Sequence, residues 1–270
     1  MTVFGIDFTS APSSRKPITC VRTRFKGASL SFEELLHLHD FEAFEGLLAA
    51  PGPWVAGLDF PFGQARRLVE NIGWPDSWAG YVAAVSRLDR ADFRKVLEDY
   101  KRDRAPGDKQ HKRTCDALTR SQSPQTLYGT PVALMFYEGA PRLLQAGVHL
   151  PCNHDGDRSR VALEVYPGIV ARRLIGRTSY KNDSKRKQTA EQRRARRSLL
   201  AALTGKPGED IYGFSIAAHP ELAEDPGGDD LDALICAVQA AWGYSRADSD
   251  YGAPASLDRL EGWTADPGPR

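Results

Sequence analysis

Three segments of the chain show the short, nearly continuous apolar pattern that is typical of buried strands. They cover residues 2–8 (TVFGIDF), 54–60 (WVAGLDF) and 161–166 (VALEVY), and turn-forming residues that include proline follow each one. A further strand is predicted from Ile18 to Phe25, where β-branched and aromatic residues again dominate. The pattern therefore predicts a sheet assembled from distant parts of the chain.

Other segments repeat their apolar residues at the helical spacing. A helix is predicted to begin at Ser31, with Glu34 as its capping-box partner, and to end before the Pro-Gly-Pro sequence at 51–53. Helices are also predicted over 131–145 and 227–242, and the second of these carries a stripe of leucine, isoleucine, valine and tryptophan. This order of elements indicates an α/β fold with helices packed on a mixed sheet.

Two segments interrupt this order. Residues 64–130 are polar, increasingly charged and helical in pattern, so we interpret them as a helical insertion within a single domain that spans 1–270. Residues 205–228 are rich in glycine, proline and acids, and they predict a loop.

Each of the three apolar strands carries one carboxylate. Because alternate side chains of a strand share a face, Asp7, Asp59 and Glu164 each point away from the apolar residues beside them. Glycine stands two residues before Asp7 and before Asp59, which leaves room beside the acid for an ion or a phosphate. An isolated buried carboxylate is costly, so these acids must be paired, protonated or bound to metal.

The predicted terminal helix adds acids in its first turn. Asp229 and Asp232 are three residues apart and lie on one side of the helix, where the helix dipole favours anions. Asp230 points to a different side and is expected to stand behind the site. Converging carboxylates repel one another unless a cation joins them, and oxygen-only ligands suit Mg²⁺ or Mn²⁺. One metal-dependent catalytic site is therefore predicted from Asp7, Asp59, Glu164, Asp229 and Asp232.

Each acid also has an ordinary structural interpretation. Asp7 and Asp59 precede turn sequences, and Asp229 could cap the helix. Glu164 could pair with an arginine such as Arg172. The joint occurrence of acids on three strands and at a helix start favours a shared site.

Positive charge is concentrated in one part of a chain that is otherwise balanced. The formal net charge of the 270 residues is only +1, yet residues 172–197 are strongly basic. Such density predicts contact with a phosphate backbone through counterion release, with a solvated helix face as the alternative. The residues predicted to bind nucleic acid are Arg172, Arg173, Lys181, Lys185, Arg186, Lys187, Arg193, Arg194 and Arg197.

The cysteines and the start of the chain bear on its compartment. The four cysteines are widely spaced and form no CxxC pair, which favours reduced thiols. No charged segment followed by a long apolar stretch opens the sequence, and no apolar run approaches the roughly 18 residues of a membrane span. We therefore expect a cytoplasmic protein that does not enter a membrane.

Several segments together resemble one family. GIDFTSAP, GLDFPFG, EGAPRLL, LEVYPG and DDLDALICAVQAAW occur in an order and spacing similar to the DUF429 family, whose members are described as predicted RNase-H-like nucleases. The resemblance runs from Gly5 to at least Trp242. The start of the terminal helix also resembles that of RuvC-type Holliday-junction resolvases, which presents an Asp-x-x-Asp pair. A homodimer is compatible with that second likeness.

The resemblance implies a ribonuclease H-like mixed sheet flanked by helices, and a nuclease that uses two divalent ions, Mg²⁺ or Mn²⁺. Asp7 then takes the role of the first-strand aspartate and bridges both ions. Asp59 or Glu164 supplies the acid of a neighbouring strand, and the choice between them stays open. Asp229 and Asp232 supply the acids of the terminal helix. The implied substrate is nucleic acid, either DNA or RNA.

Two other functions stay open from the sequence. Sugar kinases and actin share this core fold and read nucleotide phosphates with an early strand that runs Asp-x-Gly-x-Thr, so a nucleotide-binding phosphotransferase or ATPase is one alternative. Here residues 7–10 (Asp-Phe-Thr-Ser) have the hydroxyls but lack the glycine. A non-catalytic nucleic-acid-binding module is the other alternative, and it would bind without needing metal.

Overall fold

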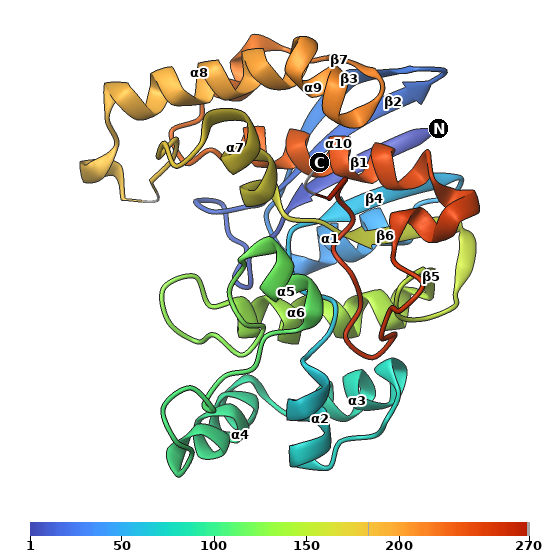
Figure 1. The fold of residues 1–270 in the computed structure, drawn as a ribbon, viewed down its shortest axis with the longest axis vertical. Coiled ribbons are helices and arrows are strands. Elements are labelled where there is room, and N and C mark those ends of the chain that lie inside the picture. Colours follow the sequence, from blue (N-terminus) through green and yellow to red (C-terminus); the bar gives the residue numbers. More distant parts are fainter. Residues whose placement is uncertain (183, 269–270) are drawn as a thin grey trace.

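A computed structural model describes residues 1–182 and 184–268 of the chain. Within these residues, seven strands form one mixed sheet in the order β5-β6-β4-β1-β2-β3-β7 (Figure 1). β1, β2 and β3 are antiparallel neighbours, whereas β1, β4, β6 and β5 run parallel, as do β3 and β7. The strands are β1 (Thr2–Asp7), β2 (Ile18–Lys26), β3 (Ser29–Leu38), β4 (Trp54–Leu58), β5 (Val148–His149), β6 (Asp157–Glu164) and β7 (Ser215–Ala217).

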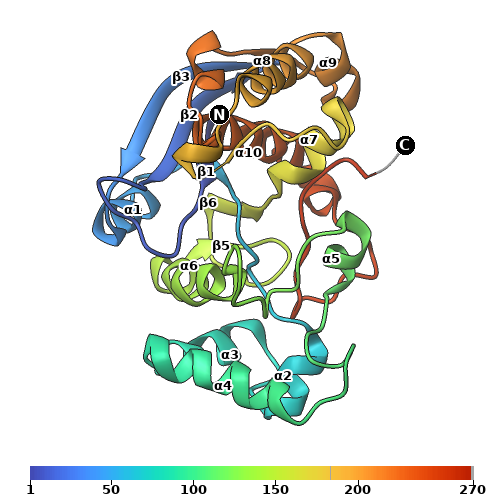
Figure 2. The same ribbon diagram turned by 90° about the vertical axis from the view of Figure 1, so that its left-hand side faces the viewer.

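Helices cover both faces of this sheet. On one face α10 contacts β1, β2 and β4 and is flanked by α7 and α9, while α8 packs on α7 and α9. α1 and α6 lie on the other face, and α3 and α4 pack against α6 (Figure 2). The helices are α1 (Phe41–Leu48), α2 (Arg66–Ile72), α3 (Trp78–Val85), α4 (Arg90–Arg102), α5 (Thr114–Thr119), α6 (Val132–Ala146), α7 (Pro167–Ile175), α8 (Ala190–Thr204), α9 (Lys206–Tyr212) and α10 (Asp229–Tyr244).

The alternation of side chains along the strands divides the apolar core into two layers. In β1, Phe4 and Ile6 belong to the layer between the sheet and α6, whereas Val3 belongs to the layer under α10. This arrangement confirms the predicted α/β fold, a mixed sheet flanked by helices, and it is consistent with a ribonuclease H-like core.

Helix α10 lies very close to the sheet because glycine occupies the contact points. A Cβ added to Gly5 would lie 1.9 Å from the Ala233 oxygen and 2.2 Å from the Ala237 nitrogen. A Cβ added to Gly57 would lie 2.4 Å from the Cys236 oxygen. Backbone therefore rests on backbone, and this contact fixes where the first turn of α10 stands relative to the ends of β1 and β4.

The helix predicted to begin at Ser31 is wrong. Residues 29–38 form β3, which pairs with the whole of β2 after a tight turn at Gly27 (φ 59°). The helix comes later, since α1 begins after Asp40, whose Oδ1 accepts a 2.8 Å hydrogen bond from the Ala43 nitrogen. A capping-box pattern is a local preference, whereas pairing with β2 satisfies a full row of backbone donors and acceptors.

The loop predicted over 205–228 is also wrong in part, because this segment contains α9 and β7. Ile216 of β7 is buried and pairs with Leu30 of β3. Pro207 stands in the first turn of α9, where proline is compatible with a helix. The composition of this segment did not indicate α9 and β7, because both elements are short and are stabilised by the neighbours on which they pack.

The remaining elements are confirmed with shifted boundaries, namely the strands at 2–8, 18–25, 54–60 and 161–166 and the helices at 131–145 and 227–242. The segment 64–130 contains α2, α3, α4 and α5, and its description as an insertion within one domain stays a prediction. Across the described ranges 1–182 and 184–268, every helix is too short or too polar to cross a bilayer.

Replacing Gly5 with alanine is expected to destabilise the protein by about 3 kcal/mol or more, because the added Cβ overlaps the Ala233 oxygen. Gly46→Ala in α1 is the matched control, since a Cβ there meets nothing within 4 Å and alanine favours a helix. Urea unfolding followed by circular dichroism measures both variants. Equal free energies of unfolding would contradict the close packing of α10.

Candidate functional site

Asp7 and Asp59 stand side by side at the carboxyl ends of two parallel strands. Asp7 ends β1, and Asp59 directly follows β4, with its backbone nitrogen donating a 3.0 Å hydrogen bond to the Ile6 oxygen. Both lie on the face that α10 covers, because Gly5 and Gly57, two residues earlier, contact α10. Asp7 is 9% exposed and Asp59 is half-buried. Among the described residues, none donates a hydrogen bond to either carboxylate.

Asp232, in the first turn of α10, brings a third carboxylate to the same place. Its side chain is 1% exposed, its Oδ1 accepts a 2.7 Å hydrogen bond from the Tyr180 hydroxyl, and its Oδ2 contacts Lys181 Nζ. The stem of Lys181 lies on Gly228, where an added Cβ would be 2.9 Å from Lys181 Cβ. The charge of Lys181 also acts on Asp7 and on Asp59. One ammonium group thus serves carboxylates from three elements.

Burial and mutual repulsion make Asp7 and Asp59 hard to ionise. Burial is the largest cause that raises the pKa of Asp7 well above its usual value, and the neighbouring carboxylates add to it. Burial, followed by the charge of Asp232, raises the pKa of Asp59 to about 7. For Lys181, burial would lower the pKa, but the charges of Asp232 and Asp7 outweigh it and raise the pKa. The cluster therefore favours further positive charge or protons.

The other two acids of the first turn lie at the edge of this cluster. Asp229 is bound by Lys16, whose Nζ lies 2.8 and 3.0 Å from its two oxygens, although its charge still raises the pKa of Asp7. Asp230 faces His37 of β3, with 3.5 Å between Oδ1 and Nε2. The helix start thus directs its three acids to three different partners.

Glu164 lies on the opposite face of the sheet from Asp7 and Asp59. It ends β6 in register with Leu58, whose side chain belongs to the apolar layer beneath α6. Asp59, one residue after Leu58, points to the other side. The parallel ends of β4 and β6 therefore bring the acids close in space but send Glu164 away from α10.

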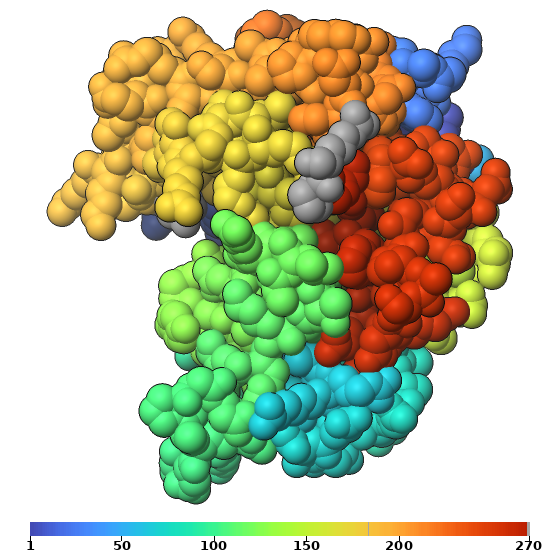
Figure 3. Space-filling view, viewed as in Figure 1, coloured from blue at the N-terminus to red at the C-terminus, as the bar shows by residue number. Residues whose placement is uncertain are grey.

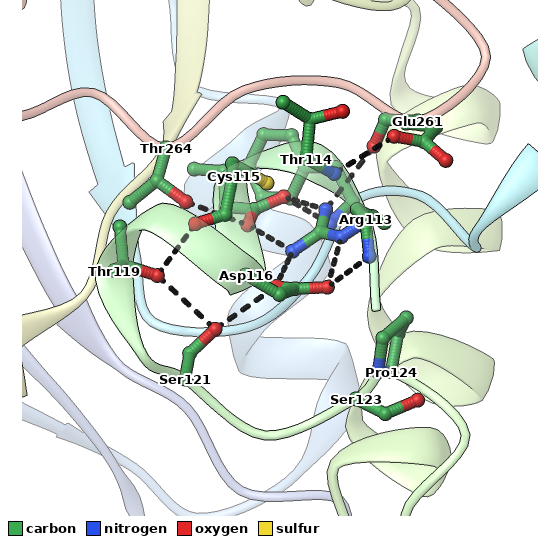
Figure 4. A network of polar contacts seen from close by, with 12 residues as sticks. Arg113, Thr114, Cys115, Asp116, Thr119, Ser121, Ser123, Pro124, Glu261 and Thr264 are labelled. Atoms are coloured by element: carbon green, nitrogen blue, oxygen red, sulfur yellow. Dashed lines mark hydrogen bonds and ion pairs between the residues drawn. The ribbon is translucent and has the colours of Figure 1, made fainter. Parts of the chain in front are cut away.

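A buried arginine, Arg113, binds Glu164 there. Figure 4 shows Arg113 between Asp116 and Glu261. Arg113 is 2% exposed, and its two terminal nitrogens lie 2.7 and 2.6 Å from the Glu164 oxygens. The backbone nitrogen of Phe62 donates a 2.7 Å hydrogen bond to Glu164, and Thr264 donates one at 3.3 Å. Asp116 takes up the rest of the guanidinium at 2.8 and 3.0 Å. Glu164 does pair with an arginine, but with one from the 64–130 segment rather than with Arg172.

The basic residues predicted to bind nucleic acid fall into two groups. Lys185, Arg186 and Lys187 form an exposed 3-10 turn, η1 (Lys185–Lys187), and no described residue forms an ion pair with them. The other residues already have partners. Arg172 donates a hydrogen bond to the backbone oxygen of Thr119. The remaining ion pairs are Arg173 with Asp266, Lys181 with Asp232, Arg194 with Glu191, and both Arg193 and Arg197 with Glu224. Of the residues predicted to bind nucleic acid, only those of η1 form no ion pair or hydrogen bond through their side chains with a described residue.

A cavity of about 260 Å³ opens beside Asp59 and Asp232. Its walls come from the ends of β4 and β6, the start of α7, the 180–181 segment and the residues around α5 and α6. On the face shown in Figure 3, the surface is hollowed where the segment near 170–187 meets the segment near 115–130. The cavity therefore joins the acidic cluster to the 64–130 segment.

These features define an α/β protein with an acidic site at the carboxyl ends of its parallel strands. A family model described as a protein of unknown function (DUF429) matches residues 5–249, and the chain belongs to this family. No curated protein and no solved structure matches the chain. All the acids predicted from the sequence, from Asp7 to Asp232, lie inside the matched range.

Three residues that shape the site were not predicted from the sequence, namely Lys181 as a partner of the acids, Tyr180 and Arg113. Lys181 was assigned to a phosphate surface, yet it binds Asp232, and Tyr180 shares that carboxylate. Arg113 belongs to a charged segment that was interpreted only as an insertion. An arginine three residues before Asp116 was the available signal, but such pairs occur commonly on helix surfaces.

The raised pKa of Asp59 predicts how the free energy of unfolding changes with pH. Because its pKa of about 7 exceeds the usual 3.8, the folded protein holds a proton that the unfolded chain releases between these values. The stability linked to this proton is present at low pH and is lost as the pH rises through about 7. In EDTA, Asp59→Asn is therefore expected to be more stable than wild type at pH 8, by on the order of 4 kcal/mol, and nearly equal at pH 3, which lies below both pKa values.

Urea unfolding of both proteins at several pH values measures this difference. Asp248→Asn is the matched control, because its carboxylate is exposed in the 3-10 turn η3 (Ala247–Gly252), which follows the far end of α10. A stability difference for Asp59→Asn that does not change with pH would contradict the assignment.

Proposed function

We propose that this protein is a divalent-metal-dependent nuclease that hydrolyses phosphodiester bonds of nucleic acid. The observation that carries the proposal is the convergence of Asp7, Asp59 and Asp232 around the single ammonium of Lys181. Three carboxylates with one positive charge leave the cluster short of cation, and carboxylates held together in this way are the usual setting for Mg²⁺ or Mn²⁺.

The residues fit such an ion in charge and in donor type. Asp7 and Asp59 offer oxygens that no described residue binds by a hydrogen bond, and Asp232 would join them once Lys181 moves aside. Among residues 1–182 and 184–268, no three His, Cys, Asp or Glu side chains already stand in a ligating arrangement. The carboxylates would therefore close around the ion as the ammonium leaves.

The contacts of Glu164 give it a different role in this proposal. Its oxygens are engaged by Arg113, Phe62 and Thr264, and a buried ion pair that loses one partner is costly. We therefore assign Asp59 as the ligand and Glu164 as the residue that anchors Arg113. Asp229, bound by Lys16, adds negative charge at the edge of the cluster.

The bound ion would supply a Lewis acid to the phosphate and acidify a water molecule. The protein's part is to hold its carboxylates in place before the substrate arrives. Backbone packing of α10 on Gly5 fixes Asp232, and strand pairing fixes Asp7 and Asp59. Pre-positioned charge of this kind lowers the reorganisation that the reaction requires.

The exposed turn η1 supplies the proposed contact with the substrate backbone. Lys185, Arg186 and Lys187 have no ion-pair partner among the described residues and follow Lys181 in the same segment. Basic side chains bind phosphates with release of counterions, so this contact should weaken with salt. We further propose a cytoplasmic location, because all four cysteines are unpaired.

Metal-dependent cleavage tests the proposal directly. The purified protein is incubated with labelled single-stranded, duplex, hybrid and four-way-junction substrates in Mg²⁺, Mn²⁺ or EDTA. We expect cleavage only with metal, and a loss on the order of 100-fold or more in Asp7→Asn, because that carboxylate lies at the centre of the cluster. Asp230→Asn is the matched control and should retain activity, since its carboxylate faces His37.

Cleavage in EDTA, or equal cleavage by the two variants, would contradict the assignment of this site. Hydrolysis of ATP without cleavage of any nucleic acid would favour the phosphotransferase instead. Binding of nucleic acid that needs no metal and leads to no turnover would favour a non-catalytic module.

Lys181→Met is expected to raise the affinity for Mn²⁺ by about tenfold, because the variant removes an ammonium that competes for Asp232. The metal-free variant should also unfold at a lower temperature, since the cluster loses its internal cation. Titration calorimetry measures the affinity, and Lys187→Met in η1 is the control that removes an exposed charge. An unchanged Mn²⁺ affinity in Lys181→Met would argue against competition at Asp232.

A further inference from the structure

The cavity beside the acids has two kinds of wall. The charged groups Asp59, Asp232 and Lys181 come from the end of β4, the start of α10 and the 180–181 segment, and Arg113, Asp116 and Glu164 line the opposite side. Val132 and Met135 of α6 supply apolar surface. A ligand with a phosphate and a flat, largely apolar ring matches this combination, because the phosphate would suit a divalent ion held by the acids, as proposed above, and the ring suits the aliphatic wall.

Polar groups on the same wall can form hydrogen bonds with the edge of a ring. Gln122 lies after α5, is exposed, and lines the cavity with its neighbour Ser121. An amide both donates and accepts, which is the property that reads the edge of a nucleobase. Tyr166 adds an aromatic surface from the end of β6.

The wall is fixed rather than soft. Arg113, just before α5, binds Glu164 at the end of β6 and Asp116 within α5, and it also donates to the Glu261 oxygen (Figure 4). Because these buried contacts join the 64–130 segment to the sheet, the cavity keeps its width. The volume of the cavity is about 260 Å³, which is slightly smaller than the roughly 300 Å³ of the smallest typical small-ligand pockets.

We propose that this cavity holds one nucleotide residue of a flexible strand, so that the protein acts on single-stranded or frayed nucleic acid rather than on intact duplex. The inference rests on the proposed nuclease function and names its substrate class. A base that is stacked and paired in a duplex cannot enter such a cavity without being extruded, and extrusion costs a few kcal/mol. A single strand presents its bases without that cost.

Nucleoside monophosphates test the cavity separately from catalysis, because they contain no phosphodiester bond to cleave. In Mg²⁺, we expect AMP or dAMP to bind at least about tenfold more tightly than inorganic phosphate in titration calorimetry, since only the nucleotide also contacts the apolar wall. Val132→Trp is expected to fill the cavity and to weaken nucleotide binding by at least about tenfold, with phosphate binding unchanged. In cleavage assays a single strand should be cut at least about tenfold faster than a blunt duplex.

Leu118→Trp is the matched control, because Leu118 is 66% exposed on α5 and does not line the cavity. Thermal unfolding shows whether each variant is folded. Gln122→Ala provides a milder second variant on the exposed side of the wall, and it should weaken AMP binding without changing phosphate binding.

The inference is overturned if nucleotides bind no more tightly than phosphate, or if Val132→Trp binds AMP as Leu118→Trp does. It is also overturned if duplex is cut as fast as a single strand. Metal-dependent cleavage without nucleotide binding would contradict the assignment of the cavity as a nucleotide site and would leave the nuclease proposal intact. Nucleotide binding that Val132→Trp removes, without cleavage of any substrate, would support the cavity and overturn the nuclease proposal.

Discussion

Helix α10 packs backbone against backbone on β1 and β4, because Gly5 and Gly57 present no side chain to it. A contact of this kind leaves little freedom in how the helix lies, since any added atom meets a carbonyl or an amide nitrogen. It places the first turn of α10 beside the carboxyl ends of the two strands. The position of Asp232 relative to Asp7 and Asp59 follows from that contact, and so does the acidic cluster itself.

The cluster is costly to the folded protein, and the surrounding structure offsets part of the cost. Like charges in a partly buried place repel one another, and Lys181 supplies only one compensating charge. Clustered charges occur in proteins mainly at functional sites. The repulsion in the metal-free cluster and its proposed role in binding metal therefore have the same cause, which is the closeness of the carboxylates. The segment that carries Lys181 continues into the exposed basic turn η1, so the proposed phosphate-binding residues and the internal cation belong to one connection.

A second buried ion pair, between Arg113 and Glu164, has a structural role on the other face of the sheet. Arg113 and Glu164 join the 64–130 segment to the end of β6, and Asp116 accepts hydrogen bonds from the same guanidinium. The result is a fixed wall opposite the cluster, with the cavity between them. One end of one sheet thus carries two groups of charged residues: three carboxylates share one ammonium in the first, and two carboxylates share one guanidinium in the second.

The sequence by itself determined the α/β class, the strands that end in Asp7 and Asp59, and the acidic start of the terminal helix, because these depend on local periodicity and on the alternation of side chains. It misassigned Ser31, where a local capping pattern yielded to cross-strand pairing with β2. Only the tertiary structure decided that Glu164 lies across the cavity from Asp232, on the other face of the sheet, and that Arg113 is its partner. Those facts depend on strand register and on contacts between residues 51 positions apart, neither of which a local pattern encodes.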